Sequence, residues 1–211
     1  MIYELRTYTV RQGTMPEMMK LAGGVFRESR GDNYGKLEGY WFTDIGPLNQ
    51  VMQLWSFADF NERTRLRAEL GKNERWNKKY LPAARALLLR QQTRLLTGVV
   101  APKTPEGTPN VYEFRNYRTK PGAVVQWAGL LKNVLPAREK LSKIVGLWIT
   151  ESPEVNEACH IWAYKDLNHR AQVRAAGVQD PDFSAFLKES APLVEEMHST
   201  IMLPAPCSPL K

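Results

Sequence analysis

The hydrophobic and polar positions of the chain change their period in a regular order. Ile2–Val10 alternates and is rich in strand-forming residues, and residues 15–25 then carry apolar side chains at helical spacing. Two more strand-like runs, 37–44 and 51–57, precede a second helical stretch after Asp59, and 92–97 has the pattern of a last strand. This β-α-β-β-α-β order is that of a ferredoxin-like unit.

Two short motifs predict how the helices of this unit begin. Thr14 stands three residues before Glu17, and Asp59 stands three residues before Glu62. A hydroxyl or carboxylate at the first position and a Glu three residues later form a capping box, which satisfies backbone N–H groups at a helix start. The sequence therefore predicts capped helices that begin after residues 14 and 59.

The second half of the chain repeats the first. Residues 2–13, IYELRTYTVRQG, align with 111–122, VYEFRNYRTKPG. In a second block Gly39, Trp41, Trp55, Asp59, Arg63 and Arg67 return as Gly146, Trp148, Trp162, Asp166, Arg170 and Arg174. We therefore predict a first unit over 1–98, a Pro/Gly/Thr-rich linker over 99–110, a second unit over 111–203 and a Pro-rich tail over 204–211.

These repeated residues resemble the NIPSNAP family in three places: the opening Y-E-L-R-T-Y, the central G-x-W, and W-x-F/Y-x-D-x-x-x-R-x-x-x-R. A later aromatic residue, Trp76 or Phe183, also fits, and the resemblance covers nearly the whole chain, twice. It implies an α+β fold of two ferredoxin-like units packed sheet to sheet, an intramolecular dimeric α/β barrel. That superfamily includes antibiotic-biosynthesis monooxygenases, haem-degrading enzymes and muconolactone isomerases, so the resemblance implies a fold more firmly than a reaction.

Strand alternation predicts which side chains face the second sheet. We expect the more apolar face, with Tyr3 and Leu5 in the first strand, to pack under the helices. The opposite face is then polar and aromatic, and buried charges there must be paired, as Glu4–Arg6 and Glu113–Arg115 can be. A cavity between the sheets is the expected ligand site. The candidate residues are His160 and Glu113 for catalysis, and Arg115, Tyr117, Trp148, Trp162, His198, Glu4 and Arg6 for ligand binding.

The two histidines leave several alternatives open. Gln53 and Gln92 of the first copy become His160 and His198 in the second, which predicts an asymmetric site that belongs mainly to the second copy. Imidazoles beside Glu113 can act as a general base or hold a divalent metal, and they can equally be structural hydrogen-bonding groups. No metal site is assigned, and the cofactor is unknown. The repeated D-F/L-N-x-R motif reads as helix capping, with its Arg pairing across the units.

Two hypotheses for function remain. The first is a small-molecule protein with a cofactor-independent oxygenase or isomerase activity, and the second is a non-enzymatic binding or scaffold protein. Nucleic-acid binding ranks last, because no RNP1-like string is present and the sheet faces are expected to be covered by each other. The basic residues behind the net charge of +7 are interpreted as a solvated helical face with interspersed acidic residues. We also expect no membrane span, a cytoplasmic location and a homo-oligomer.

Overall fold

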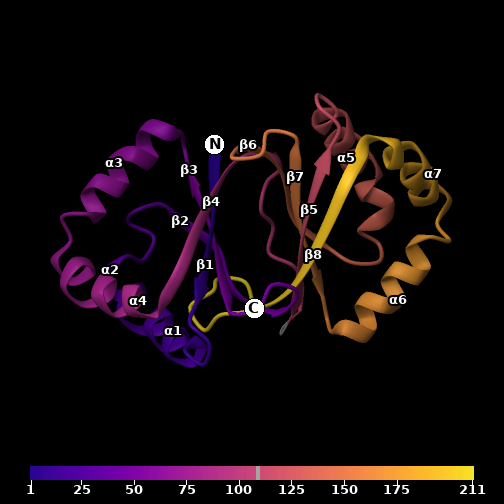
Figure 1. Cartoon of the computed structure of the whole chain (residues 1–211). Coiled ribbons are helices and arrows are strands. Elements are labelled where there is room, and N and C mark those ends of the chain that lie inside the picture. The colour runs from indigo at the N-terminus through magenta and orange to yellow at the C-terminus, as the bar shows by residue number, and fades with distance from the viewer. Residues whose placement is uncertain (108–109) are drawn as a thin grey trace. The chain divides into compact units, whose positions relative to one another are not determined.

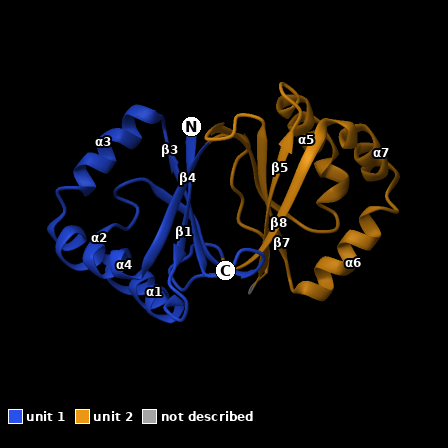
Figure 2. Cartoon of the chain, viewed as in Figure 1, with its two compact units in different colours: residues 1–95, 203–210 blue, residues 96–202, 211 orange. Residues whose placement is uncertain are grey.

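The computed structural model describes residues 1–107 and 110–211, so residues 108–109 of the expected linker lie outside the described residues. The described chain divides into two compact units (Figure 2). Unit 1 comprises residues 1–95 and 203–210, and unit 2 comprises residues 96–202 and 211. Each unit is therefore built from segments that are far apart in the sequence.

Unit 1 has the expected strand and helix order, with its helices on one face of its own sheet (Figure 1). Its strands are β1 (Ile2–Val10), β2 (Lys36–Ile45), β3 (Gln50–Phe57) and β4 (Leu88–Val100), the last of which continues into unit 2. Its helical segments are α1 (Met15–Leu21), the π-helical turn η1 (Ala22–Phe26), α2 (Arg27–Ser29), α3 (Phe60–Leu70), the π-helical turn η2 (Trp76–Tyr80) and α4 (Leu81–Leu87).

Unit 2 repeats this plan, again with its helices on one face of its sheet (Figure 1). Its strands are β5 (Val111–Thr119), β6 (Ile144–Ser152), β7 (Glu157–Tyr164) and β8 (Val194–Pro204), whose end belongs to unit 1. Its helices are α5 (Val124–Arg138), α6 (Leu167–Gly177), α7 (Pro181–Ser190) and the short 3-10 helix η3 (Ala191–Leu193).

The strand order is that of a ferredoxin-like sheet in both units. It runs β4-β1-β3-β2 in unit 1 and β8-β5-β7-β6 in unit 2. The strands β4 and β8 each begin in one unit and end in the other. The α+β fold class expected from the sequence is confirmed.

Each unit has its own hydrophobic core between sheet and helices. In unit 1 the core joins Met18 and Phe26 of the first helical segment to Trp55 of β3. In unit 2 it joins Trp127 of α5 and Phe186 of α7 to Trp162 of β7. Corresponding tryptophans of the repeat therefore anchor corresponding cores.

The capping predictions had different outcomes. Asp59 accepts a hydrogen bond from the backbone N–H of Glu62 at 2.8 Å and so caps the helix as predicted. The Glu62 carboxylate reaches one residue further back than in a capping box and accepts from the N–H of Ala58 at 2.6 Å. The helix after Thr14 begins at Met15 as predicted, but the predicted capping box there was wrong. The Thr14 hydroxyl donates to the carbonyl oxygen of Arg11 at 2.7 Å and makes no capping hydrogen bond to the described helix.

The G-x-W motif has a steric explanation. A Cβ atom added to Gly39 would lie 2.1 Å from Cη2 of Trp41, and one added to Gly146 would lie 2.4 Å from Cη2 of Trp148. Both glycines also lie where the pairing register of their strand shifts. Glycine is therefore needed so that the indole two residues later can lie across the strand.

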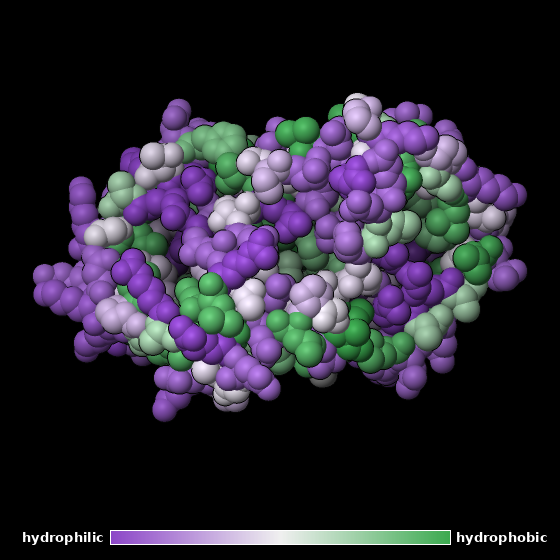
Figure 3. Space-filling view, viewed as in Figure 1, coloured by the Kyte–Doolittle hydropathy of each residue, from purple (hydrophilic) through white to green (hydrophobic). Residues whose placement is uncertain are grey.

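The charged surface of unit 1 has the features of a solvated helical face. Arg65 pairs with Glu69 at 2.9 Å and Lys78 pairs with Glu74 at 3.3 Å, each one helical turn apart. Figure 3 shows hydrophilic side chains along the outer edge of unit 1, where α2 to α4 lie in Figure 1. Among the described residues, no helix is long and apolar enough to cross a membrane.

Candidate functional site

The structure corrects the predicted faces of four strands. Glu4 pairs in register with Trp55 and Arg6 with Gln53, and Trp55 belongs to the core that packs under the helices of unit 1. The same holds in unit 2, where Trp162 is the partner of Glu113. The predicted site residues of β1, β5 and β7 therefore lie under the helices of their own unit. The expected apolar helix-facing set, Tyr3 and Leu5 among them, lies on the opposite face.

The error has a physical cause. Both faces of these strands are buried, as the 1% exposure of both Glu4 and Leu5 shows, so burial alone does not reveal which face the helices cover. In β2 and β6 the more apolar face does pack under the helices, as expected from alternation, and it contributes Tyr40 and Leu147 to the two cores. A polar face can lie under the helices because those helices supply its counter-charges.

Those counter-charges come from the repeated Arg motif. In unit 2, Arg170 of α6 donates to Glu113 at 2.7 Å, together with Ser199 of β8 at 2.6 Å and Tyr164 at 3.1 Å. Arg115 lies 3.5 Å from the same carboxylate. Burial by itself raises the pKa of Glu113, but the Arg170 bond, the Arg115 charge and the Ser199 bond outweigh it and lower the pKa to about 2.

Unit 1 builds the same network around Glu4. Arg6 and Arg63 donate to its carboxylate, and Arg67 donates at 3.2 Å. The predicted Glu4–Arg6 and Glu113–Arg115 pairs are thus confirmed. The pairing of Arg63 and Arg170 across the units was wrong, because each reaches the glutamate of its own unit directly from the adjacent helix.

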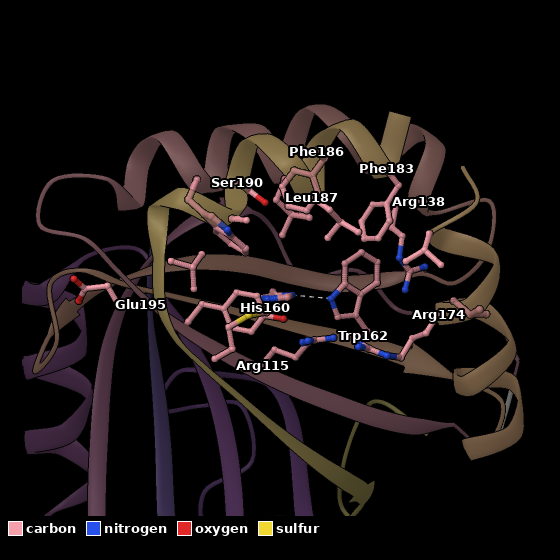
Figure 4. A pocket seen from close by; sticks show the side chains of 18 of the residues that line it. Arg115, Arg138, His160, Trp162, Arg174, Phe183, Phe186, Leu187, Ser190 and Glu195 are labelled. Atoms are coloured by element: carbon pink, nitrogen blue, oxygen red, sulfur yellow. Dashed lines mark hydrogen bonds between the residues drawn. The ribbon is translucent and has the colours of Figure 1, made fainter. Parts of the chain in front are cut away.

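A pocket of about 340 Å³ lies between the sheet of unit 2 and α5, α6 and α7 (Figure 4). Its sheet side is formed by Arg115, Tyr117, His160 and Trp162. Its helix side is mainly apolar and is formed by Trp127, Leu131, Val173, Phe183, Phe186 and Leu187. Four of the predicted site residues therefore do come together, in a pocket within one unit.

The protonation of His160 follows from its neighbour. The indole N–H of Trp162, which can only donate, donates to Nδ1 of His160 at 2.7 Å (Figure 4). Burial and the charge of Arg115 lower the pKa of His160 to about 3, so the ring is neutral at pH 7. A neutral imidazole that accepts at Nδ1 carries its proton on Nε2. That buried Nε2–H has no hydrogen-bond partner among the described residues, and His160 is 4% exposed.

The sequence analysis missed one charged residue of this pocket, Arg138 at the end of α5. Its guanidinium lies over the Trp162 ring, 4.5 Å from the centroid, and donates to Ser142 at 2.9 Å. It is 5% exposed and has no carboxylate partner among the described residues, and burial lowers its pKa. Arg30 takes the same place in unit 1, 3.5 Å from the Trp55 centroid. The sequence did contain a signal for this residue, because an arginine precedes the G-x-W motif by eight or nine residues in both copies.

The Gln53/His160 difference preserves one hydrogen bond. In unit 1 the indole of Trp55 donates to Oε1 of Gln53 at 3.1 Å, as that of Trp162 does to His160. An amide oxygen and an unprotonated imidazole nitrogen are both acceptors. Each of the two side chains also has an N–H donor, the amide nitrogen of Gln53 and Nε2 of His160. The contrast that predicted an asymmetric site is therefore smaller in the structure than in the sequence.

Five predicted residues do not line this pocket: Glu113, Glu4 and Arg6, whose ion pairs are given above, and Trp148 and His198. Trp148 is fully buried on the sheet face opposite the helices, because it is out of phase with Leu147. His198 pairs in register with Asn116, out of phase with Arg115, and its side chain is 62% exposed beside Glu196. His160 and His198 therefore point to opposite faces and cannot share a metal. Among the described residues, no cluster of three or more His, Cys, Asp or Glu could hold one.

The comparisons with known proteins agree with this architecture. The NIPSNAP family model matches residues 3–102 and again 112–209. The chain belongs to the NIPSNAP family. It is 28% identical over 216 residues to Protein NipSnap homolog 3B of Mus musculus, covering 99% of this chain and 85% of that one. It is also 28% identical over 211 residues to the Protein NipSnap homolog of Dictyostelium discoideum, covering 96% and 87%.

Solved structures show the same fold at low sequence identity. A proposed monooxygenase from Lactobacillus acidophilus aligns with a TM-score of 0.71 at 13% identity, covering 98% of this chain and 97% of that one. An anthrone oxidase-like protein aligns with a TM-score of 0.63 at 12% identity, covering 96% and 90%. At these identities the likeness concerns the fold alone.

Proposed function

We propose that this NIPSNAP protein binds a small, largely apolar molecule in the unit 2 pocket, through an acceptor oxygen at His160 and a negative charge at the arginines. The observation that carries the proposal is the buried Nε2–H of His160, which has no partner and borders the pocket. A buried donor without an acceptor costs free energy that a ligand oxygen recovers on binding. The surrounding phenylalanines and leucines suit a planar aromatic body.

The charges around the pocket favour an anionic group on the ligand. Arg115, Arg138 and Arg174 line it, and the one lining carboxylate, Glu195, is already paired with Arg118. Arg115 also has a buried Nε–H without a partner. Guanidinium groups recognise carboxylates through paired N–H donors, so an aromatic carboxylate is the simplest ligand class that satisfies these groups.

The geometry supports binding more directly than it supports proton abstraction. The oxygenase or isomerase chemistry suggested by the fold needs a base, and His160 has its Nδ1 occupied and a pKa of about 3. Glu113, the other catalytic candidate, is held as a carboxylate by three donors. What the pocket offers to a reaction is stabilisation of an oxyanion, by the His160 N–H and the arginines.

Calorimetric titration of the full chain with 2-naphthoate tests the proposal. We expect saturable binding that weakens about tenfold in His160→Leu, which has no donor, and stays within about threefold in His160→Gln, which keeps one. Arg174→Gln, an exposed position, should also weaken binding, and Arg67→Gln in unit 1 should not. The scaffold alternative predicts no binding of 2-naphthoate, 2-naphthol or decanoate at millimolar concentration.

A further inference from the structure

Unit 1 contains a second pocket with a different chemical character. It has a volume of about 280 Å³ and lies between the sheet of unit 1 and its helices. Four arginines from four segments line it: Arg6, Arg30, Arg67 and Arg85. No Asp or Glu is among its described lining residues. Its unit 2 counterpart has three arginines and one glutamate among its described lining residues, so the two pockets differ in the charge they present to a ligand.

The positive charge of this pocket is not balanced by the protein. The nearby carboxylate is Glu4, and it already receives Arg6, Arg63 and Arg67. Arg30 and Arg85 have no carboxylate partner within 4.0 Å among the described residues. A cluster of cations around one small cavity stores electrostatic repulsion that a bound anion relieves.

Arg30 is the buried member of this cluster. It is 4% exposed, its guanidinium lies 3.5 Å from the centroid of the Trp55 ring, and one of its N–H groups donates to the backbone oxygen of Tyr34 at 3.2 Å. Its Nε–H is buried without any acceptor. Burial lowers the pKa of Arg30 to about 10, in keeping with a cation that lacks a counter-ion.

We propose that the unit 1 pocket is a second binding site, for a small organic dianion such as a phosphate monoester, anchored by Arg30 and Arg85. Two N–H donors of an arginine can bind two phosphate oxygens at once. The carboxylate of Glu4 is shared by Arg6, Arg63 and Arg67, so Arg30 and Arg85 supply positive charge for a doubly negative group. The organic part has an aromatic wall in Trp76 and Tyr80, whose rings stack at 4.3 Å. This site does not depend on the ligand proposed for unit 2.

Calorimetric titration of the full chain with phenyl phosphate, at low and at physiological salt, tests the site. We expect binding that Arg30→Met, which keeps the bulk over Trp55, weakens about tenfold or more. Arg85→Gln carries little folding risk because Arg85 is exposed, and it should weaken binding about threefold and flatten the salt dependence. Arg138→Met, the matched change in unit 2, should leave phenyl phosphate binding unchanged.

Benzoate and inorganic phosphate complete the experiment. Benzoate carries one charge and also belongs to the class proposed for unit 2, so only the part of its binding that Arg30→Met removes is compared, and this part should be weaker than that of phenyl phosphate. Inorganic phosphate should compete with phenyl phosphate at higher concentration. The proposal is overturned if phenyl phosphate does not bind at millimolar concentration, if the Arg30-dependent binding of benzoate is tighter than that of phenyl phosphate, or if Arg138→Met abolishes phenyl phosphate binding while Arg30→Met and Arg85→Gln do not. Binding of 2-naphthoate should be unchanged in Arg30→Met. The proposal for the unit 2 pocket is therefore tested independently of the proposal for the unit 1 pocket.

Discussion

Arg170 reaches from α6 to the carboxylate of Glu113 on β5, with 2.7 Å between Nη2 and Oε1. Arg63 makes the same connection to Glu4 in unit 1. Each link ties a helix to the sheet it covers through the most buried charge of the unit. The repeated Y-E-x-R and D-x-x-x-R motifs are thus two ends of one structural connection, present once in each copy.

Removing one end of this connection should be costly. We predict that Glu113→Gln lowers the free energy of unfolding by about 3 kcal/mol, because Arg115 and Arg170 keep their charges and lose the counter-ion between them. Urea denaturation of the variant and the wild type measures the difference. Glu195→Gln, at a partly exposed ion pair, is the control and should cost less than about 1 kcal/mol. Equal stability of Glu113→Gln and wild type would contradict a structural role for this network.

The buried imidazole predicts how stability depends on pH. The pKa of His160 is about 3 in the folded protein and near 6.5 in the unfolded chain, so the unfolded state binds a proton first as the pH falls. The contribution of His160 to stability is complete above about pH 6.5 and is lost as the pH falls towards 3. Between pH 7 and 5 the free energy of unfolding should drop by up to about 2 kcal/mol from this group.

The matched variant for this effect is His160→Gln, which keeps the acceptor for Trp162 and cannot titrate. Its free energy of unfolding should depend less on pH between 7 and 5 than that of the wild type. The window stays above 4.5, where the carboxylate of Glu113 is ionised in both states. Identical pH slopes for the two proteins would show that His160 is not buried as a neutral ring.

The glycine of the G-x-W motif offers a comparison within one unit. Gly146→Ala should destabilise the protein by about 1–3 kcal/mol, because the new Cβ would meet the Trp148 ring at 2.4 Å. Gly129→Ala, in the middle of α5 with nothing within 4 Å of the new Cβ, should stabilise it by up to about 1 kcal/mol. Opposite shifts of the thermal midpoint are expected, and a neutral Gly146→Ala would show that Trp148 moves aside freely.

Much of the fold could be predicted because the sequence of one unit is repeated in the other. The recurrence of Trp55 as Trp162 identified the duplication, and the 2-residue and 3.6-residue periods placed most strands and helices. The face assignment failed because Glu4 and Leu5 are equally buried, so polarity did not indicate which face the helices cover. Only the contacts of Arg63 with Glu4, which join residues 59 positions apart, decide it.

The candidate site was found in part for a related reason. His160, Arg115 and Trp162 were predicted together because alternation along paired strands keeps them on one face whichever way that face points. Arg138 was missed because its role depends on where the end of α5 lies over the sheet. No local sequence pattern predicts that position. His198 was wrongly included, because the register of β8 against β5 places Ser199 beside Arg115 in its stead.

The last prediction concerns the end of the chain, which the sequence presents as a Pro-rich tail. In the structure residues 203–210 belong to unit 1. Ala205 donates its backbone N–H to the carbonyl oxygen of Tyr40 at 2.9 Å, and Ser208 accepts from the N–H of Tyr40 at 3.0 Å. Both Ala205 and Ser208 are almost fully buried. These contacts fasten the segment along β2.

Deleting residues 203–211 should therefore destabilise unit 1 more than unit 2. The amides of β2 and β3 should lose protection from hydrogen exchange in the shortened chain, while those of β5 and β7, which pair with each other, should change little. Ser208→Ala removes one hydrogen bond and should cost about 1 kcal/mol, with its exchange effect centred on Tyr40. Protection of β2 that survives the deletion would mean that the tail is dispensable for unit 1. Equal loss in both units would instead mean that they unfold together.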